Sequence, residues 1–384
     1  MAQTINSRFT FPVRYREFSD NAAFNYQLNR YYSIGQARLE DMEEVGKKVT
    51  SIEEWKSAML EQAEQAVSDA RLSHAATYFR ASEFYLNRDD PEKQQLYDRF
   101  ITTFNQAFDG DEIDRFQVPY GEGFLPVMRL PAEGPENLGT VVIHGGNDSF
   151  MEEFYPLSRY FAAHGHDVVA FEGPGQGSAL KTYGLFLDQE WEKPTGAVLD
   201  YLKLEDVTLI GISMGGWLSL RAAAYEPRIS RVIAWSVSYD VLKYTNAFGE
   251  WAAKLMFRKF RKFTNNSMVQ KAKKDLEYSW FVNNLMYITG KDTPVEAFDV
   301  LFQFSEENLQ SDRVQQDVLI LTGKEDHFVP YKMHDIQVKA LTNARSVTSR
   351  VFTNDEHAGS HCQMGNLGLA LDVMLQWIKD KTHA

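Results

Sequence analysis

Hydrophobic and polar residues alternate with two different periods along this chain of 384 residues, and the period changes near residue 110. Before that point apolar residues recur every three or four positions, for example over Ser51–Ala63 and His74–Tyr85. This spacing is typical of an amphipathic helix, and Ser51 followed by Glu54 fits a capping box at a helix start. Residues 1–112 are therefore predicted to form a helical N-terminal domain.

Beyond residue 112 short apolar runs alternate with helical patterns. Two strand-like runs that flank Gly121–Gly123 predict a β-hairpin. The regular alternation of strand and helix predicts an α/β fold, in which a mostly parallel sheet has helices on both faces. Further strands are predicted at 139–144, 167–171, 207–212, 232–235, 318–321 and 346–352, and helices near 151–163, 192–203, 215–225, 331–341 and 362–379.

One connection in this second part is much longer than the others. It runs from the strand that ends at Trp235 to the strand that begins at Val318, and its pattern is helical and aromatic-rich. We expect residues 113–384 to form a core domain, with a helical lid inserted at about 240–310 over the carboxyl ends of the strands. The lid is basic, which fits a solvated face, a surface that docks an acidic partner subunit, or attraction of an anionic substrate. Its cations are Lys254, Arg258, Lys259, Arg261, Lys262, Lys271, Lys273 and Lys274.

The composition narrows the classes of partner. A net charge of −13 argues against nucleic acid and anionic membranes as partners, because both attract basic surfaces. No apolar stretch reaches the roughly 20 residues of a membrane span, and the first residues lack a signal-peptide pattern. The single cysteine, Cys362, leaves no internal disulfide. We therefore expect a cytoplasmic protein, and a homodimer is possible because the N-terminal helices carry apolar faces.

The pentapeptide Gly211-Ile-Ser-Met-Gly215 follows a predicted strand and precedes a predicted helix. This is the G-x-S-x-G pattern in its required context, a sharp turn that exposes a serine hydroxyl at the top of a sheet. The two glycines leave room for the turn, and the helix that follows favours developing negative charge near its N-terminus. Ser213 is therefore the candidate nucleophile.

A serine hydroxyl needs a base to remove its proton and an acid to orient that base. In this type of fold the acid and then the histidine follow the serine along the chain. Asp326 comes after the predicted strand at 318–321, and His361 comes after the one at 346–352, so both should reach the same edge of the sheet. His357 is the rival base, and Glu325, Asp355 and Glu356 are rival acids, whereas His327 and His334 are expected to hold a turn and face solvent.

Hydrogen-bond donors for an oxyanion are predicted at two backbone positions. One is the N–H of Met214, which directly follows the nucleophile. The other comes from the loop after the strand that ends at His144, where Gly146 is preferred and its neighbours Gly145 and Asn147 remain alternatives. His144 itself is expected to hold this loop in place.

The sequence predicts neither a metal nor another cofactor. His, Cys, Asp and Glu form no cluster with metal-ligand spacing. The stretch Glu172-Gly-Pro-Gly-Gln-Gly177 is rich in glycine, but it lacks the lysine and the spacing of a phosphate-binding loop. We interpret it as a tight structural turn beside the site.

Five motifs together resemble the α/β-hydrolase superfamily. The likeness is closest to the branch that holds dihydroxypseudooxynicotine hydrolase, the fungal polyketide-shortening hydrolases and the fermentation–respiration switch proteins. It covers about residues 115–384 and departs at Glu172, where the branch commonly has Asp. The motifs are His144-Gly-Gly-Asn with Glu152-Glu153, Glu172-Gly-Pro-Gly-Gln-Gly177, Gly211-Ile-Ser-Met-Gly-Gly216, Gly323-Lys-Glu-Asp-His-Phe-Val-Pro330 and Ala358-Gly-Ser-His-Cys-Gln-Met-Gly365.

The resemblance implies a Ser-Asp-His triad of Ser213, Asp326 and His361, and an N-terminal helical domain that covers the site. Members of the branch cleave esters or carbon–carbon bonds next to a ketone. We therefore expect a serine hydrolase that acts on a small to medium substrate with such a bond, and Asp240 or Glu250 are candidates for an additional acid or base. The alternatives are an aminopeptidase of the prolyl oligopeptidase kind and a non-catalytic binding or regulatory protein on a hydrolase scaffold.

Overall fold

The computed structural model describes residues 9–382, which separate into two compact units. Unit 1 contains the described part of Met1–Glu112 together with the short segment Met364–Gly368. Unit 2 contains Ile113–Gln363 and the chain from Leu369 onward. The first change of unit falls where the hydrophobic period of the sequence changes. The chain then enters unit 1 a second time, close to its C-terminal end.

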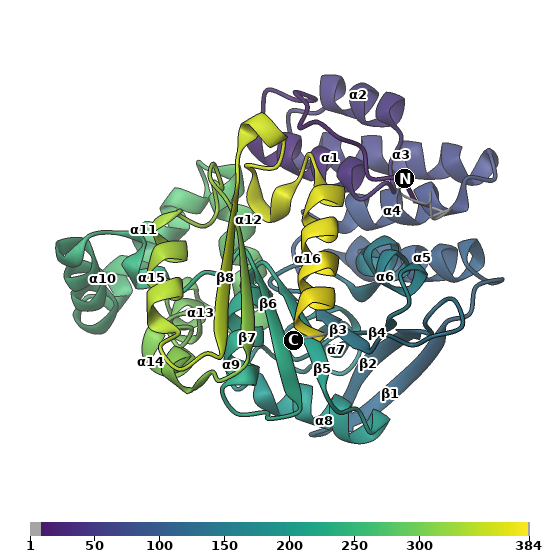
Figure 1. Cartoon of the computed structure of the whole chain (residues 1–384). Coiled ribbons are helices and arrows are strands. Elements are labelled where there is room, and N and C mark those ends of the chain that lie inside the picture. Colours follow the sequence, from purple (N-terminus) through teal and green to yellow (C-terminus); the bar gives the residue numbers. More distant parts are fainter. Residues whose placement is uncertain (1–8, 383–384) are drawn as a thin grey trace. The chain divides into compact units, whose positions relative to one another are not determined.

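Unit 1 is helical, as the sequence predicts (Figure 1). Its core is aromatic. Phe24 stacks on Trp55 with ring centroids 5.2 Å apart, and Tyr85 meets the Trp55 ring edge-on at 5.3 Å. The buried indole N–H of Trp55 donates to Ala81 O (2.8 Å), so this large side chain is both packed and satisfied. The helices are α1 (Ala22–Ser33), α2 (Leu39–Lys48), α3 (Ile52–Ser68), α4 (Leu72–Glu83) and α5 (Pro91–Ala107).

The predicted start of the helix at Ser51 is confirmed, with a change in its capping. The Ser51 hydroxyl accepts the N–H of Glu54 (3.2 Å), which satisfies one of the free donors of the first turn of α3. The Glu54 carboxylate accepts from the backbone N–H of Thr50 (2.8 Å) and from the Thr50 hydroxyl. In a capping box Glu54 would accept the N–H of Ser51, whereas here it accepts the N–H of the preceding residue, Thr50.

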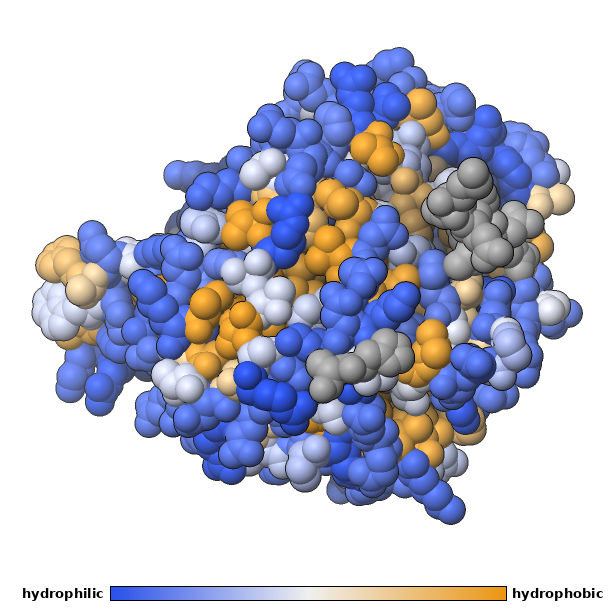
Figure 2. All heavy atoms as spheres, viewed as in Figure 1, coloured by the Kyte–Doolittle hydropathy of each residue, from blue (hydrophilic) through white to orange (hydrophobic). Residues whose placement is uncertain are grey.

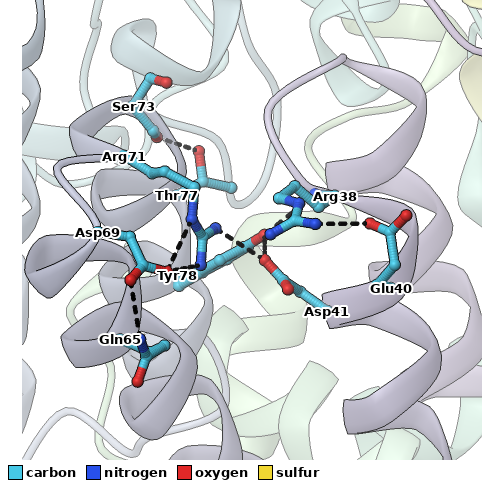
Figure 3. Close-up of polar contacts among 9 residues, drawn as sticks. All are labelled: Arg38, Glu40, Asp41, Gln65, Asp69, Arg71, Ser73, Thr77 and Tyr78. Carbon is cyan, nitrogen blue, oxygen red and sulfur yellow. Dashed lines mark hydrogen bonds and ion pairs between the residues drawn. The ribbon is translucent and has the colours of Figure 1, made fainter.

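A buried polar network joins α2 to α4 inside unit 1 (Figure 3). The Asp41 carboxylate accepts from Arg71 Nη1 (3.0 Å) and from the Tyr78 hydroxyl (2.8 Å). The Tyr78 oxygen in turn accepts the backbone N–H of Arg38 (3.0 Å). Burial raises the pKa of Tyr78, so its hydroxyl stays a neutral donor to Asp41.

The segment Met364–Gly368 is attached to the N-terminal part of unit 1 by backbone groups of Gly365. The Gly365 N–H donates to the hydroxyl of Ser33 (2.9 Å), and the Gly365 carbonyl accepts the N–H of Arg14 (2.5 Å). Ser33 is fully buried, so its hydroxyl makes this bond away from solvent. Two of the bonds that hold the segment therefore come from residues more than 300 positions earlier in the chain.

Unit 2 is built on an eight-stranded sheet with the order β1-β2-β4-β3-β5-β6-β7-β8. The first two strands pair as the predicted hairpin, β2 is antiparallel to β4, and all other neighbours are parallel. The predicted mostly parallel sheet is thereby confirmed. The strands are β1 (Asp114–Tyr120), β2 (Gly123–Leu130), β3 (Thr140–His144), β4 (Asp167–Phe171), β5 (Val207–Ile212), β6 (Ile229–Trp235), β7 (Asp317–Gly323) and β8 (Ser346–Phe352).

Helices cover both faces of this sheet (Figure 1). On one face of the sheet, Leu209 of β5 and Val232 of β6 are buried in one cluster with Trp217 of helix α9 (Met214–Ala223). Ile210 and Ile233 are equally buried and point to the opposite face, because side chains alternate along a strand. The helices are α6 (Tyr155–Ala163), α7 (Gly177–Lys181), α8 (Glu192–Leu202), α9 (Met214–Ala223), α15 (Lys332–Ala340) and α16 (Leu367–Thr382), with short 3-10 helices η1 (Met151–Phe154), η4 (Asn354–Glu356) and η5 (His361–Gln363).

The long connection between β6 and β7 forms a helical insertion. Leu285 and Ala297, on two of its helices, are buried in the main cluster, so the inner part of the insertion belongs to the core. The outermost helix buries no residue, and Phe248 and Trp251 on it are 72% and 58% exposed. Figure 2 shows hydrophobic and hydrophilic residues side by side at this projecting end. The insertion contains η2 (Val241–Tyr244), α10 (Ala247–Lys259), α11 (Arg261–Ala272), α12 (Leu276–Thr289), α13 (Pro294–Leu301), α14 (Glu306–Leu309) and η3 (Ser311–Arg313).

No helix within residues 9–382 combines the length and the apolar character that crossing a membrane requires.

Candidate active site

The turn between β5 and α9 holds Ser213 in an unusual backbone conformation. Its φ of 61° and ψ of −124° lie in a region that residues with a side chain rarely adopt. The Ser213 N–H donates to Trp235 O (2.8 Å), which ties the turn to the neighbouring strand β6. A Cβ at Gly211 would overlap with Gly215 O, and one at Gly215 would lie 2.6 Å from Gly145 O. The two glycines of the motif are therefore required by close packing.

The structure brings the side chains of Ser213, Asp326 and His361 together at the carboxyl end of the sheet. His361 Nε2 lies 2.9 Å from Ser213 Oγ, and His361 Nδ1 lies 2.6 Å from Asp326 Oδ2. Asp326 follows β7 and His361 lies in η5 after β8, as their positions in the sequence predict. The three side chains thus form a continuous chain of hydrogen bonds from carboxylate to hydroxyl.

The electrostatics of this chain favour an ionised carboxylate and a basic imidazole. Burial of Asp326 opposes its ionisation, but the adjacent His361 and two backbone N–H groups outweigh burial and lower the pKa of the carboxyl. Burial of His361 disfavours its charged form, and the Asp326 carboxylate outweighs that effect and raises the pKa of the imidazole above its usual value.

The rival residues of the two loops are placed elsewhere. His357 is exposed at the end of η4, where its backbone adopts a left-handed conformation with a φ of 58°. Glu325 and Asp355 are exposed, and Glu356 forms an ion pair with Arg350. The contacts given for Ser213 and His361 instead join these two side chains to each other and to Asp326.

The loop after β3, residues 145–147 (the glycine loop), lies directly beside the turn that holds Ser213. A Cβ at Gly146 would be 2.8 Å from the backbone nitrogen of Met214, so only glycine allows the two backbones to approach this closely. The N–H of Met214 is the first of α9, where no helical carbonyl is available to accept it. The two predicted oxyanion donors, Gly146 and Met214, therefore belong to neighbouring backbone segments.

His144 is a fully buried residue behind the glycine loop. Its Nδ1 lies 3.0 Å from Gly145 O, and its ring packs against Phe171 and Trp191. Burial lowers its pKa to about 4, so the imidazole is neutral near pH 7 and can donate one N–H to the Gly145 carbonyl. This position fits a residue that holds the loop.

The glycine-rich turn after β4 wraps around the buried carboxyl group of Glu172. Glu172 Oε1 accepts the N–H of Met151 (3.1 Å), and Oε2 accepts the N–H of Ser178 (2.6 Å). Burial and the neighbouring charge of Glu152 raise the pKa of Glu172 to about 8. The backbone donor at Ser178 therefore binds a carboxyl group of the chain itself, as a structural turn requires. The sequence did not predict this buried acidic group, and the turn motif was its only signal.

Three further side chains that the sequence singled out have the following contacts. Asp240 is buried and accepts backbone N–H groups of Leu242 (2.9 Å) and Glu306 (3.3 Å), which is a structural use of both its oxygens. Glu250 pairs with Lys254 (2.6 Å) on the outer helix α10. The prediction that His334 faces solvent is wrong, because its Nδ1 lies 2.8 Å from the Thr322 hydroxyl and the residue is buried. Within the described part of the chain, no group of three or more His, Cys, Asp or Glu side chains is placed to hold a metal ion.

The model of the alpha/beta hydrolase family matches residues 140–362, which is more than half of the chain and includes the site. The chain therefore belongs to the alpha/beta hydrolase family and is a hydrolase.

Fungal hydrolases are similar over most of its length. Hydrolase acrC of Aspergillus aculeatus is 27% identical over 82% of this chain and 82% of that protein. The 20-hydroxy-prefusarin hydrolase FUS2 of Gibberella moniliformis is 27% identical over 81% of this chain and 80% of its own length.

Among solved structures, 2,6-dihydroxy-pseudo-oxynicotine hydrolase superposes with a TM-score of 0.65 at 22% identity, covering 92% of this chain and 95% of that one. These relatives confirm the expected branch of the superfamily.

Proposed function

We propose that the protein is a serine hydrolase in which Ser213 is the nucleophile, His361 the base and Asp326 the residue that orients it. The observation that carries this proposal is the pair of hydrogen bonds that joins the three side chains, at 2.6 and 2.9 Å. A histidine held between a carboxylate and a serine hydroxyl is the arrangement that makes a serine nucleophilic. The close approach of Gly146 to the backbone nitrogen of Met214 supports these two N–H groups as the donors that would stabilise an oxyanion.

With an ester, His361 Nε2 takes the hydroxyl proton while Ser213 Oγ bonds to the carbonyl carbon. The carbonyl oxygen then carries the negative charge toward the two backbone donors. When the intermediate collapses, the carbon–oxygen bond to the alcohol breaks and His361 returns the proton to the leaving oxygen. Water, deprotonated by His361, then releases the acid and restores Ser213.

A carbon–carbon bond next to a ketone is cleaved by the same groups. Ser213 adds to the ketone carbon, and the bonding electrons leave on the adjacent carbon, which His361 protonates. The substrate class is a small to medium molecule with an ester or a ketone-activated bond. The naming of one relative for 20-hydroxy-prefusarin and of a structural neighbour for 2,6-dihydroxy-pseudo-oxynicotine supports an organic molecule of this size.

Labelling by a fluorophosphonate probe tests the nucleophile. We expect the wild-type chain to be labelled and to hydrolyse p-nitrophenyl butyrate, and Ser213→Ala to lose both properties. Ser219→Ala is the matched control, because Ser219 is a buried serine of the same helix whose hydroxyl donates to Gly216 O (3.1 Å). An unlabelled wild-type protein, or labelling that persists in Ser213→Ala, would contradict the proposal.

A substrate panel and a binding experiment with the same two proteins, wild type and Ser213→Ala, separate the alternatives. Preferential turnover of aminoacyl p-nitroanilides over esters would support the aminopeptidase, and a partner that binds wild type and Ser213→Ala equally well, without turnover, would support a binding protein. Three expectations stay predictions: that the N-terminal helices cover the site, that the protein is a homodimer, and that it is cytoplasmic. Light scattering coupled to size-exclusion chromatography tests the dimer.

A further inference from the structure

The side chain of Gln176 binds backbone groups at both ends of its amide. The residue ends the connection between β4 and α7, and only 3% of its surface is exposed. Its Nε2 donates to Gly145 O (2.7 Å) and Gly146 O (3.2 Å), and its Oε1 accepts the N–H of Gly173 (3.1 Å). An N–H group can only donate and a carbonyl can only accept, so these partners decide which end of the amide faces the glycine loop.

All three carbonyl groups of the glycine loop accept from side chains. Gln176 binds those of Gly145 and Gly146, and Asn284 Nδ2 of α12 donates to Asn147 O (3.1 Å). In a trans peptide unit the C=O and the N–H point in opposite directions. Fixing the carbonyls of residues 145 and 146 therefore fixes the directions of the N–H groups of residues 146 and 147, which include the predicted second oxyanion donor.

The backbone that carries Gln176 is itself held on both sides. Glu172 accepts the N–H of Ser178, two residues after Gln176. Gly175 has a φ of +82°, and a Cβ there would lie 2.7 Å from Leu187 Cβ, so the turn is closely packed. Gly146 O accepts from Gln176, whereas Gly145 O also lies 3.0 Å from His144 Nδ1. Loss of the Gln176 side chain would therefore release the carbonyl of the peptide unit between residues 146 and 147 and would weaken the hold on the unit between residues 145 and 146, which keeps the His144 contact.

We propose that Gln176 is a positioning residue for the oxyanion donors. It binds the carbonyl side of the glycine loop and thereby holds the N–H side in the direction that an oxyanion on the substrate requires, without contact with the substrate. The inference rests on the proposed function, because an oxyanion arises only if Ser213 adds to a carbonyl carbon.

Gln176→Met removes both donated bonds at nearly constant side-chain volume. With p-nitrophenyl butyrate we expect kcat to fall about 10²-fold, the usual loss for one oxyanion donor, with KM unchanged. Gln316→Met is the matched control. Gln316 is also buried and also bridges backbone groups, with Nε2 on Ala223 O (2.9 Å) and Oε1 on the Gln315 N–H (2.9 Å), but it precedes β7 at the opposite end of the sheet. We expect it to keep the wild-type kcat.

A pair of inhibitors separates positioning from general loss of structure. Phenyl trifluoromethyl ketone bonds through its carbonyl carbon to Ser213 Oγ, the hydroxyl proton passes to His361, and the former carbonyl oxygen becomes an anion. The corresponding alcohol has the same shape but no carbonyl to accept the bond. In Gln176→Met we expect the inhibition constant of the ketone to rise about 10²-fold and that of the alcohol to stay unchanged. A residue with only a structural role would weaken both inhibitors together or neither.

Gln176→Glu keeps the length of the side chain and its bond from Gly173, but it places a carboxylate oxygen against two carbonyl oxygens. We expect the same selective loss, and this variant carries the test if Gln176→Met does not fold. The inference is overturned if a folded variant keeps the wild-type ratio of ketone to alcohol affinity while Ser213→Ala is inactive. Retained activity in Ser213→Ala would instead overturn the proposed function.

Discussion

Asp326 divides its two carboxylate oxygens between two tasks. Oδ2 meets His361 Nδ1, while Oδ1 accepts the backbone N–H groups of Phe328 and Val329, each at 2.9 Å. The backbone bonds fix the plane of the carboxylate, so the oxygen that faces His361 cannot exchange places with the other. The imidazole is thereby held as the Nδ1–H tautomer, with its Nε2 lone pair toward Ser213.

Asp326→Asn should therefore reverse the tautomer. The amide oxygen will accept the N–H groups of Phe328 and Val329, which leaves the NH₂ group facing His361 Nδ1. Nδ1 must then accept, and Nε2 carries the proton and cannot act as a base. We expect kcat for p-nitrophenyl butyrate to fall about 10⁴-fold with little change in the melting temperature. A loss below tenfold would contradict the orienting role.

The pH dependence of hydrolysis follows from His361. Only the neutral imidazole can take the proton of Ser213, and the Asp326 carboxylate raises the imidazole pKa above 6.5. Activity should therefore be absent at low pH and rise as the pH passes through the raised pKa, so that the acid limb of kcat/KM has its midpoint above pH 6.5. A midpoint below that value, measured with an ester that does not titrate, would contradict this expectation.

The turn that holds Ser213 is so closely packed that two of its positions have room only for glycine. It brings the backbone of the glycine loop against the first turn of α9, and the side chain of any residue other than glycine at two of its positions would overlap with backbone atoms. Ser213 lies between β6, to which its N–H donates at Trp235 O, and the first turn of α9.

Gly211→Ala tests this packing. The added methyl group overlaps with Gly215 O, which is backbone and cannot move without distorting α9. We expect a loss of about 1–3 kcal/mol in the free energy of unfolding, measured by urea denaturation, together with loss of esterase activity. Gly110→Ala is the control, since nothing lies within 4 Å of the added atom. Equal stability of the two variants would refute the steric argument.

The sequence predicts those elements whose signal is local. Strand runs such as Val207–Ile212 carry their own apolar pattern, and the order serine, acid, histidine follows from the fold class. The helix predicted near 362–379 begins only at Leu367, because Cys362 and Gln363 have φ values of 50° and 53°. Within the predicted helical insertion, the chain breaks at Phe260 between α10 and α11.

The remaining features depend on partners that are distant in the sequence. The role of Gln176 depends on carbonyls about 30 positions earlier, and the burial of His334 depends on a hydroxyl of β7. The bond from Gly365 to Ser33 joins residues 332 positions apart. Neither hydrophobic period nor motif spacing encodes such pairs, so a single sequence could not reveal them.

A segment that lies shortly after His361 in the chain belongs to unit 1, although His361 itself belongs to unit 2. His361 belongs to unit 2, and three positions later Met364 begins the segment that hydrogen-bonds within unit 1. The loop that carries His361 is thus continuous with Gly365, whose backbone N–H and carbonyl bond to Ser33 and Arg14.

Removal of residues 1–112 should therefore displace His361, because it takes away the bonding partners of the nearby Gly365. All strands among the described residues lie between Asp114 and Phe352, so we expect the fragment 113–384 to keep the circular dichroism spectrum of a strand-containing protein. Gly365 loses its bonds to Ser33 and Arg14, and misplacement of the adjoining His361 should lower kcat about 10²-fold. A folded fragment with full kcat would show that the segment does not need unit 1.

The return of this chain into unit 1 also limits which of its parts can be exchanged with those of a relative. The two units are joined by three covalent crossings, after Glu112, Gln363 and Gly368, whereas a domain appended at one terminus has a single tether. A recombinant that replaced only the N-terminal helices with those of a relative would leave five residues of the old unit, Met364–Gly368, inside the new one. Functional hybrids should therefore inherit both pieces from the same parent.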